Sequence, residues 1–164
     1  MRRKSEVKRV PLLSWDISSP YYRVKQQKSE ELQLLMKFAR EYSWSIDLRR
    51  ELSTPYEALV LTDLDQNIVY VNPGFQAMTG YSPDFAIGKK PTFLQGKSTS
   101  LTTRNQIRAK LSAEIPFSGS LVNYRNNGEA YLCEISIFPL HNSSHELTHF
   151  LAIEKELPAF VSLQ

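Results

Sequence analysis

The sequence predicts an α+β domain, an antiparallel sheet with helices on one face, preceded by an amphipathic helix. Beyond residue 56, apolar and polar side chains alternate with the period of two that is typical of strands. The alternating segments are residues 58–63, 68–72, 117–125, 129–139 and 147–157. Helix signals separate the second segment from the third. Two strands, several helices and three further strands are therefore expected, in that order.

The expected N-terminal helix starts at Ser29, whose hydroxyl can cap it, with Glu30 and Glu31 favourable in its first turn. Proline ends the helical region at Pro55 because it cannot continue the hydrogen-bond ladder. Spacings of three and four place four side chains on one apolar face. They are Leu32, Leu35, Phe38 and Tyr42. We expect this face to be buried, against the sheet or against a second chain.

Capping residues and turn residues define the later elements. Ser82 followed by Pro83 predicts the start of a short helix. Ser100 or Thr102 starts a further helix, and the expected buried stripe of that helix is Ile107, Leu111 and Ile115. The triplet at 126–128, Asn-Asn-Gly, predicts a hairpin turn because such turns need positive φ.

Length and composition are those of one globular domain with an extension: 164 residues, 41% hydrophobic and 23% charged. No apolar run is long enough to cross a bilayer, and no secretory signal is evident, so we expect a cytoplasmic protein without a membrane span. Cys133 is the single cysteine, which excludes an internal disulfide. The expected division is a basic, flexible arm at 1–28, a helical cap at 29–55, the domain at 56–157 and a tail at 158–164.

The net charge of +3 is concentrated at the N-terminus, where residues 1–25 hold seven Lys or Arg and two acidic residues. A basic arm can contact nucleic acid or an anionic membrane. We favour a solvated tail and expect no nucleic-acid binding, because no basic helical face and no interleaved aromatics accompany the charge.

From about residue 56 to residue 157, an ordered set of motifs resembles the PAS superfamily, and in particular its light-oxygen-voltage (LOV) branch. The motifs are ALVLTD at 58–63, IVYVN at 68–72, NPGFQAMTGY at 72–81, FLQG at 93–96, LVNY at 121–124 and FLAI at 150–153. The resemblance implies a five-stranded sheet around a ligand pocket. It also implies that the preceding helix packs on the outer face of the sheet or pairs with its copy in a dimer.

The reactive cysteine of LOV domains is absent from the matching position. LOV domains carry GxNCRFLQG, and their cysteine attacks the flavin after blue light. Here residues 88–96 read GKKPTFLQG, with Lys90 at the asparagine and Pro91 at the cysteine. Proline has no nucleophile, so we expect no light-driven thiol adduct.

Alternation and the resemblance together predict the pocket residues. They are Gln95, Asn123, Cys133, Ile135, Ile137, Ala152 and Glu154. LOV domains hold the polar edge of flavin with two asparagines on consecutive strands and a glutamine on the last strand. The first asparagine is retained as Asn123, the second falls on Cys133, and the glutamine falls on Glu154. The glutamine of FLQG is retained as Gln95.

Two of these replacements disfavour flavin. The thiol of Cys133 cannot supply the donor and acceptor of an amide. An ionised Glu154 would be a buried charge unless it is protonated or pairs with Lys89 or Lys90. We therefore expect no cofactor, and a pocket that is empty, water-filled, closed by side chains or occupied by another small ligand.

No catalytic or metal site is expected. Cys133 is interpreted as a small buried hydrophobe, with no basic neighbour in sequence to activate it. His141, His145 and His149 are interpreted as solvated loop residues, and the helical segments 73–87 and 101–114 contain no histidine that could hold haem.

The function expected from these observations is a stand-alone PAS sensory or protein-interaction module in signal transduction, without enzymatic activity. It would act as a homodimer or dock on a partner kinase or regulator. The alternative is a receptor for non-covalent flavin or another small ligand. A small enzyme that uses Glu154 and Cys133 is the third and least favoured reading.

Overall fold

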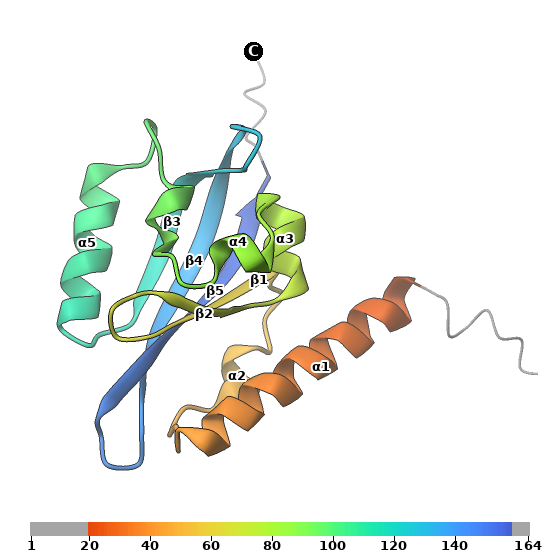
Figure 1. Cartoon of the computed structure of the whole chain (residues 1–164), viewed down its shortest axis with the longest axis vertical. Helices are drawn as coiled ribbons and strands as arrows, with labels where there is room; N and C mark the ends of the chain where they lie inside the picture. Colours follow the sequence, from red (N-terminus) through yellow and green to blue (C-terminus); the bar gives the residue numbers. More distant parts are fainter. Residues whose placement is uncertain (1–19, 159–164) are drawn as a thin grey trace, which may run out of the picture.

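The computed structural model describes residues 20–158, so most of the expected basic arm and nearly all of the expected tail lie outside the described residues. Five antiparallel strands form one sheet in the order β2-β1-β5-β4-β3 (Figure 1), and the α+β prediction is confirmed. The strands are β1 (Ala58–Thr62), β2 (Ile68–Val71), β3 (Phe117–Tyr124), β4 (Ala130–His141) and β5 (Leu147–Leu157). The helices are α1 (Pro20–Glu41), α2 (Leu48–Glu51), α3 (Pro73–Thr79), α4 (Pro83–Ala86) and α5 (Leu101–Ser112), with a 3-10 helix η2 (Pro91–Leu94).

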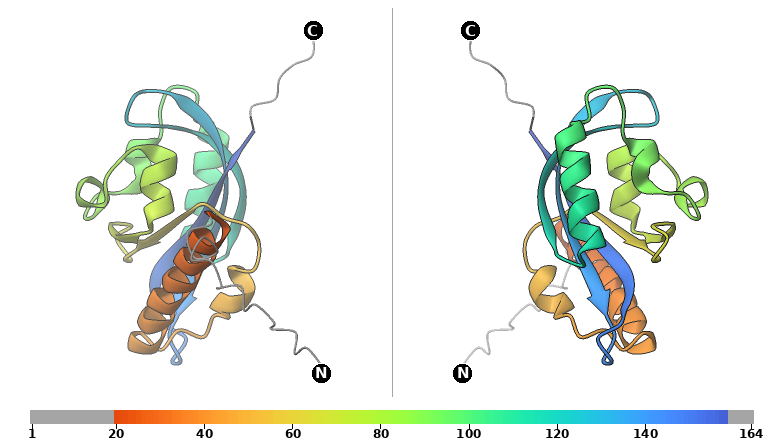
Figure 2. Two further views of the ribbon diagram at one scale, coloured as in Figure 1. Left: turned by 90° about the vertical axis from the view of Figure 1, so that its right-hand side faces the viewer. Right: turned by 90° about the vertical axis from the view of Figure 1, so that its left-hand side faces the viewer.

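Helices cover the concave face of the sheet and the part of its outer face that β1 and β5 mainly form, while Ser118 and Ser120 of β3 and Glu134 of β4 stay exposed on that outer face. On the concave face, α3, α4, η2 and α5 enclose an apolar core that includes Phe75 and Leu121, and Figure 2 shows the curvature of the sheet from two sides. On the outer face, α1 and α2 cover a second core that includes Leu59 and Leu151. Every residue of β1 is buried, as the continuous apolar run ALVLT requires of a strand covered on both faces.

The start of α1 differs from the sequence-based expectation. The helix begins at Pro20, so Ser29 lies within it as an exposed residue and does not cap it. Proline is tolerated in a first turn, and the Arg, Lys and Gln residues that follow are good helix formers, so nothing stops the helix at Ser29. Residues 20–28 therefore belong to the helix and not to a flexible arm.

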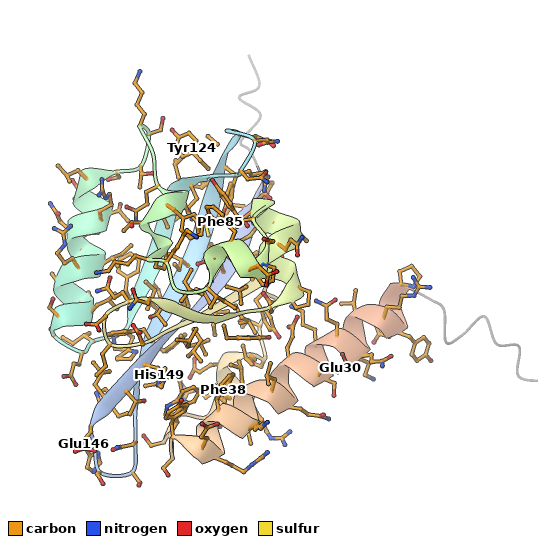
Figure 3. All side chains as sticks on the ribbon, viewed as in Figure 1. Glu30, Phe38, Phe85, Tyr124, Glu146 and His149 are labelled. Atoms are coloured by element: carbon orange, nitrogen blue, oxygen red, sulfur yellow. The ribbon has the colours of Figure 1, made fainter. Side chains whose placement is uncertain are left out.

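The apolar face of α1 packs against its own sheet. Leu35 is fully buried in the outer-face core, and Leu32 and Phe38 are partly buried against that core. Tyr42 is more exposed and packs its ring on Trp44 and His149, with ring centroids 5.9 and 4.4 Å away. Figure 3 shows Phe38 and His149 where the end of α1 meets the β4–β5 hairpin.

His149 is not a solvated loop residue, and that interpretation was wrong. It lies in β5, is buried, and also contacts the ring of Trp44 at 5.4 Å. Burial lowers the pKa of His149, which favours the neutral ring in this apolar setting. Among residues 20–158, no group of three or more His, Cys, Asp or Glu side chains could hold a metal ion.

Two local details depart from the expected pattern. Ser100 caps α5 through the amide of Thr103, but Ile115 lies past the helix end and is exposed, so the buried stripe ends at Leu111. In the β3–β4 hairpin, positive φ is needed at Gly128 alone, where it is 88°. Asparagine at 126 and 127 keeps ordinary backbone angles.

A buried polar junction joins α1 to the domain. Asn72 caps α3 by accepting from the amide of Phe75, and it also accepts from the amide of Leu59 in β1. Its Nδ2 group donates to Glu31 Oε1 at 3.0 Å, and the Tyr56 hydroxyl donates to Glu31 Oε2 at 2.7 Å. The carboxylate of Glu31 therefore connects α1 with the first strand and the first core helix.

No helix within residues 20–158 combines the length and the apolar character needed to cross a membrane.

If α1 stabilises the domain by covering its outer face, Leu35→Ala will lower the free energy of unfolding by about 2 to 5 kcal/mol, the range for cavity-forming core truncations. Leu34→Ala, on the exposed side of the same helix, is the matched control and will change it little. Urea denaturation of both variants measures the difference. Equal effects at the two positions would contradict the packing of α1 against the sheet.

Candidate ligand-binding cavity

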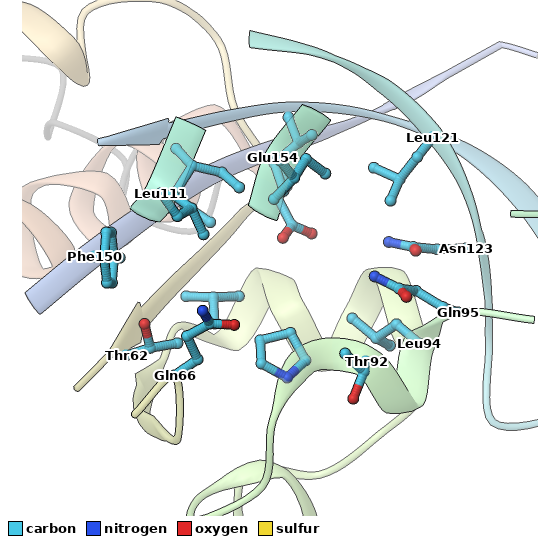
Figure 4. A pocket seen from close by; sticks show the side chains of 16 residues that line it. Thr62, Gln66, Thr92, Leu94, Gln95, Leu111, Leu121, Asn123, Phe150 and Glu154 are labelled. Atoms are coloured by element: carbon cyan, nitrogen blue, oxygen red, sulfur yellow. The ribbon is translucent and has the colours of Figure 1, made fainter. Parts of the chain in front are cut away.

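A small cavity of about 110 Å³ lies between the concave face of the sheet and the helices η2 and α5. Figure 4 shows the side chains that surround it. The strands supply one wall and the helices supply the other. The lining residues are Val60, Thr62, Gln66, Pro91, Thr92, Leu94, Gln95, Ile107, Leu111, Leu121, Asn123, Ile135, Ile137, Phe150, Ala152 and Glu154.

Two amide side chains lie near each other at one end of the cavity, Gln95 from the end of η2 and Asn123 from β3 (Figure 4). Asn123 is 4% exposed. Gln95 Oε1 and Asn123 Oδ1 are buried and find no hydrogen-bond partner among the described residues. Buried polar atoms without partners are rare in native structures, which marks these two amide side chains as candidate ligand contacts.

The loop after η2 is held against β3, and this brings Gln95 near Asn123. Thr99 accepts from the amide of Gly96 at 2.9 Å and donates to the carbonyl of Val122 at 2.6 Å. At Gly96 an added Cβ would lie 2.5 Å from the Tyr124 ring, so the close approach requires glycine. The local sequence therefore determines where the Gln95 amide lies.

Glu154 directs its carboxyl into the cavity from β5 and is 4% exposed (Figure 4). Its hydrogen-bond donor among residues 20–158 is the Cys133 thiol, whose sulfur lies 3.6 Å from Oε2. Burial raises the pKa of Glu154 to about 7. The expected pairing with lysine is not found, since Lys89 donates to the carbonyl of Phe85 and no salt bridge to Glu154 exists in the described part of the chain.

Cys133 does not line the cavity, which corrects its assignment to the pocket. The side chain is fully buried in the concave-face core, beside Glu154 and away from the cavity wall. Burial, followed by the nearby Glu154 carboxyl, raises the pKa of the thiol. Alternation placed Cys133 on the correct face but could not show that the cavity ends at Glu154.

The structure places the other predicted residues together and adds residues that sequence reasoning missed. Ile135, Ile137 and Ala152 form part of the apolar wall, as alternation predicted. Thr62 was missed, although it shares a strand face with Val60. Gln66 gave no signal, because it reaches the cavity from a turn in which its own φ is 64°.

An antiparallel sheet with helices over its concave face and a small cavity between the two layers defines a PAS-type domain. A family model described as PAS domain matches residues 57–157, and the chain belongs to this family. The LOV-like character of the sequence is also confirmed by its relatives and by the solved structures that it resembles.

Among curated proteins, the chain is similar to the blue-light-activated histidine kinase of Brucella canis, with 35% identity over 104 residues. It is also similar to the nitrogen fixation regulatory protein of Klebsiella oxytoca, with 34% identity over 107 residues. The matches cover 61% and 65% of this chain but only 21% and 22% of those proteins. The similarity therefore concerns one domain of each longer protein.

Among solved structures, the light state of the Aureochrome1 LOV photoreceptor superposes with a TM-score of 0.63 at 28% identity, covering 69% of this chain and 91% of that one. The LOV domain of the Erythrobacter litoralis EL346 blue-light-activated histidine kinase gives 0.59 at 26% identity, covering 63% and 97%.

Flavin is the cofactor that the LOV resemblance implies, and the cavity meets only part of its requirements. Gln95 and Asn123 offer amides with unused acceptors. Glu154 offers a carboxyl where an amide is needed, and Cys133 does not reach the wall. The volume of 110 Å³ is well below the roughly 300 Å³ at which ligand pockets for larger molecules begin. The cavity as arranged does not fit a flavin ring.

The raised pKa of Glu154 predicts a specific dependence of stability on pH. The folded protein holds this proton more tightly than the unfolded chain does, so stability falls as pH rises from about 4.5 to about 7. Glu154→Gln removes this dependence. Relative to the original chain, the variant will gain about 2 to 3 kcal/mol in unfolding free energy between pH 5 and pH 8.

Urea denaturation of both proteins at the two pH values measures this gain. Glu134→Gln, an exposed carboxyl on β4, is the control and will show no such gain. Parallel pH profiles for the original chain and Glu154→Gln would contradict the burial of an unpaired carboxyl.

Proposed function

We propose that this chain is a non-enzymatic sensory and protein-interaction module that works without LOV-type thiol photochemistry. The observation that carries the proposal is the position of Pro91. It lines the cavity on η2, where the LOV resemblance places the reactive cysteine. The single cysteine, Cys133, lies on β4 and outside the cavity lining.

The chemistry of the buried groups supports a role without catalysis. Glu154 in the cavity wall and Cys133 beside it are the two side chains that could act as a base and a nucleophile. The raised pKa of the thiol disfavours the thiolate form that a nucleophile needs. No histidine contacts this pair among the contacts of residues 20–158. Binding, rather than turnover, is the chemistry that these residues offer.

The two faces of β5 provide a physical route from the cavity to the outer surface. Ala152 and Glu154 face the cavity, whereas Leu151 and Ile153 pack in the core that α1 covers. A ligand that shifts β5 by a small amount would therefore also change the surface on which α1 rests. We propose that α1 carries the output to a partner such as a kinase or regulator. The similarity of 104 residues to part of a blue-light-activated histidine kinase supports a kinase as the class of partner.

The first turns of α1 supply the surface for self-association. Tyr21 is 70% exposed and Val24 is 56% exposed, and the three-residue spacing puts them on one side of the helix. Figure 1 shows this end of α1 extending past the sheet. A homodimer through this end is part of the proposal. Light scattering that reports a monomer at every working concentration would contradict it.

A second candidate function, a receptor for a small ligand, is favoured by the unpartnered oxygens of Gln95 and Asn123. It is compatible with the first, because a ligand in the cavity would be the signal that the module reads.

The absence of thiol photochemistry can be tested by blue light. Protein mixed with flavin mononucleotide will show no loss of the flavin band and no new near-ultraviolet peak, because no thiol lies at position 91. The same two absorbance changes are measured under identical illumination in Pro91→Cys, the variant that restores the cysteine of the LOV motif. A photocycle in the original chain that Cys133→Ala abolishes would show that the buried thiol reacts, and would overturn the proposal.

A further inference from the structure

We propose that the cavity binds a small organic cation that carries N–H donors, of the amine, amidine or guanidine class. Glu154 would be its counter-ion, and the side-chain amides of Gln95 and Asn123 would lie beside it as further hydrogen-bonding groups. The inference rests on the proposed sensory function and specifies the chemical class of the signal.

Glu154 has no compensating positive charge among the groups that surround it in residues 20–158. The titratable groups around it are the Cys133 thiol on β4, the Tyr131 phenol on the same strand, and Glu57, whose backbone amide donates to the Glu154 carbonyl. None of these is a cation. Arg125, which lies over the Tyr131 ring, is engaged with Glu129 and Glu156. An ionised buried carboxylate without a partner costs several kcal/mol, and a cation in the cavity would remove that cost.

The contrast with Glu31 shows what a satisfied buried carboxylate looks like in this protein. Glu31 is 3% exposed, as buried as Glu154, yet it accepts from Tyr56, Asn72 and Gln27 and lies 3.7 Å from Lys28. Glu154 receives one weak thiol donor. The missing donors of Glu154 are therefore on the side that opens to the cavity.

The other polar groups of the cavity leave Glu154 as its one charged group. The amide oxygens of Gln95 and Asn123 have no partner among residues 20–158, and each amide also carries an NH2 group that can donate. A ligand complementary to Glu154 supplies N–H donors and a positive charge, and the two amides can accept from it or donate to it. A guanidinium or ammonium group meets this requirement, whereas a carboxylate or phosphate would be repelled by the ionised Glu154.

The volume of the cavity and its apolar wall limit the ligand to a small molecule with a short hydrocarbon part. A cavity of about 110 Å³ holds a molecule of only a few heavy atoms. The opposite wall is apolar, formed in part by Leu121, Ile135 and Ile137, and suits a short hydrocarbon stem. Methylguanidinium and propylammonium combine both features and are suitable probes.

The test uses nuclear magnetic resonance of isotopically labelled protein, with methylguanidinium and propylammonium as probes and methylurea as the neutral match in shape. At pH 8 the two cations are expected to saturate and to move the side-chain amide signals of Gln95 and Asn123. Methylurea at the same concentration is expected to leave them unchanged. Affinity for the cations should rise at least tenfold from pH 5 to pH 8, because Glu154 must lose its proton to pair.

The variants Glu154→Gln and Glu134→Gln separate the charge of the cavity from surface charge. Glu154→Gln keeps the shape of the side chain and is expected to weaken cation binding at least tenfold, while Glu134→Gln, on the exposed side of β4, leaves it unchanged. The spectra themselves report whether each variant is folded. Equal binding to both variants would overturn the counter-ion role of Glu154.

Two further outcomes separate this inference from the proposed function. If methylurea binds as well as methylguanidinium and moves the same two amide signals, the cavity is a ligand site but the cation class is wrong. If none of the probes moves a cavity signal, the inference is overturned, and the blue-light experiment still decides the photochemical part of the proposed function independently.

Discussion

The apolar outer side of strands β1 and β5, which must be covered, is the constraint on which the rest of the structure depends. A five-stranded sheet with Leu59, Leu151 and Ile153 on its outer side would expose a large apolar patch if nothing covered it, and soluble monomers rarely tolerate such patches. The long helix α1 is therefore part of the folded domain. Its end is fixed by the packed rings of Tyr42, Trp44 and His149, and its middle is fixed by Glu31.

The dry outer core leaves the concave face free to contain a polar cavity. Two equally buried carboxyl groups illustrate this division. Glu31 has its hydrogen-bonding capacity met by donors from α1, the Tyr56 hydroxyl and Asn72, so its role is structural. Glu154 lines the cavity and lacks a cationic partner in residues 20–158, so its burial does not stabilise the fold. An unmet polar group of this kind is expected at a functional site.

Much of the fold followed from local physical rules, because strand alternation, caps and turn residues act over a few residues. Alternation together with the LOV resemblance identified Asn123, Ile135 and Glu154 as cavity residues. It failed where tertiary contacts decide the outcome. The start of α1 depends on residues that continue a helix rather than on the available cap at Ser29, and the burial of His149 depends on aromatic rings more than a hundred residues earlier in the chain.

The remaining errors concern how far a cavity extends. Residues of one strand face share a side of the sheet, but only packing decides which of them border empty space. Cys133 is on the right face and yet lies in solid core, whereas Gln66 reaches the cavity from a turn without any periodic signal. Pro91 was not among the predicted cavity residues, although it lines the cavity and the LOV-like motif around it had marked its position in the chain.

The central claim is that Glu154 is a buried carboxyl without a compensating charge. The most direct test is the titration of its carboxyl carbon by nuclear magnetic resonance in protein free of added ligand. The account predicts a pKa of about 7, caused by burial, and a fall in that pKa when a cation binds beside it. A titration near the ordinary value of 4.5 would mean that water or a partner already compensates the charge, and would contradict the account.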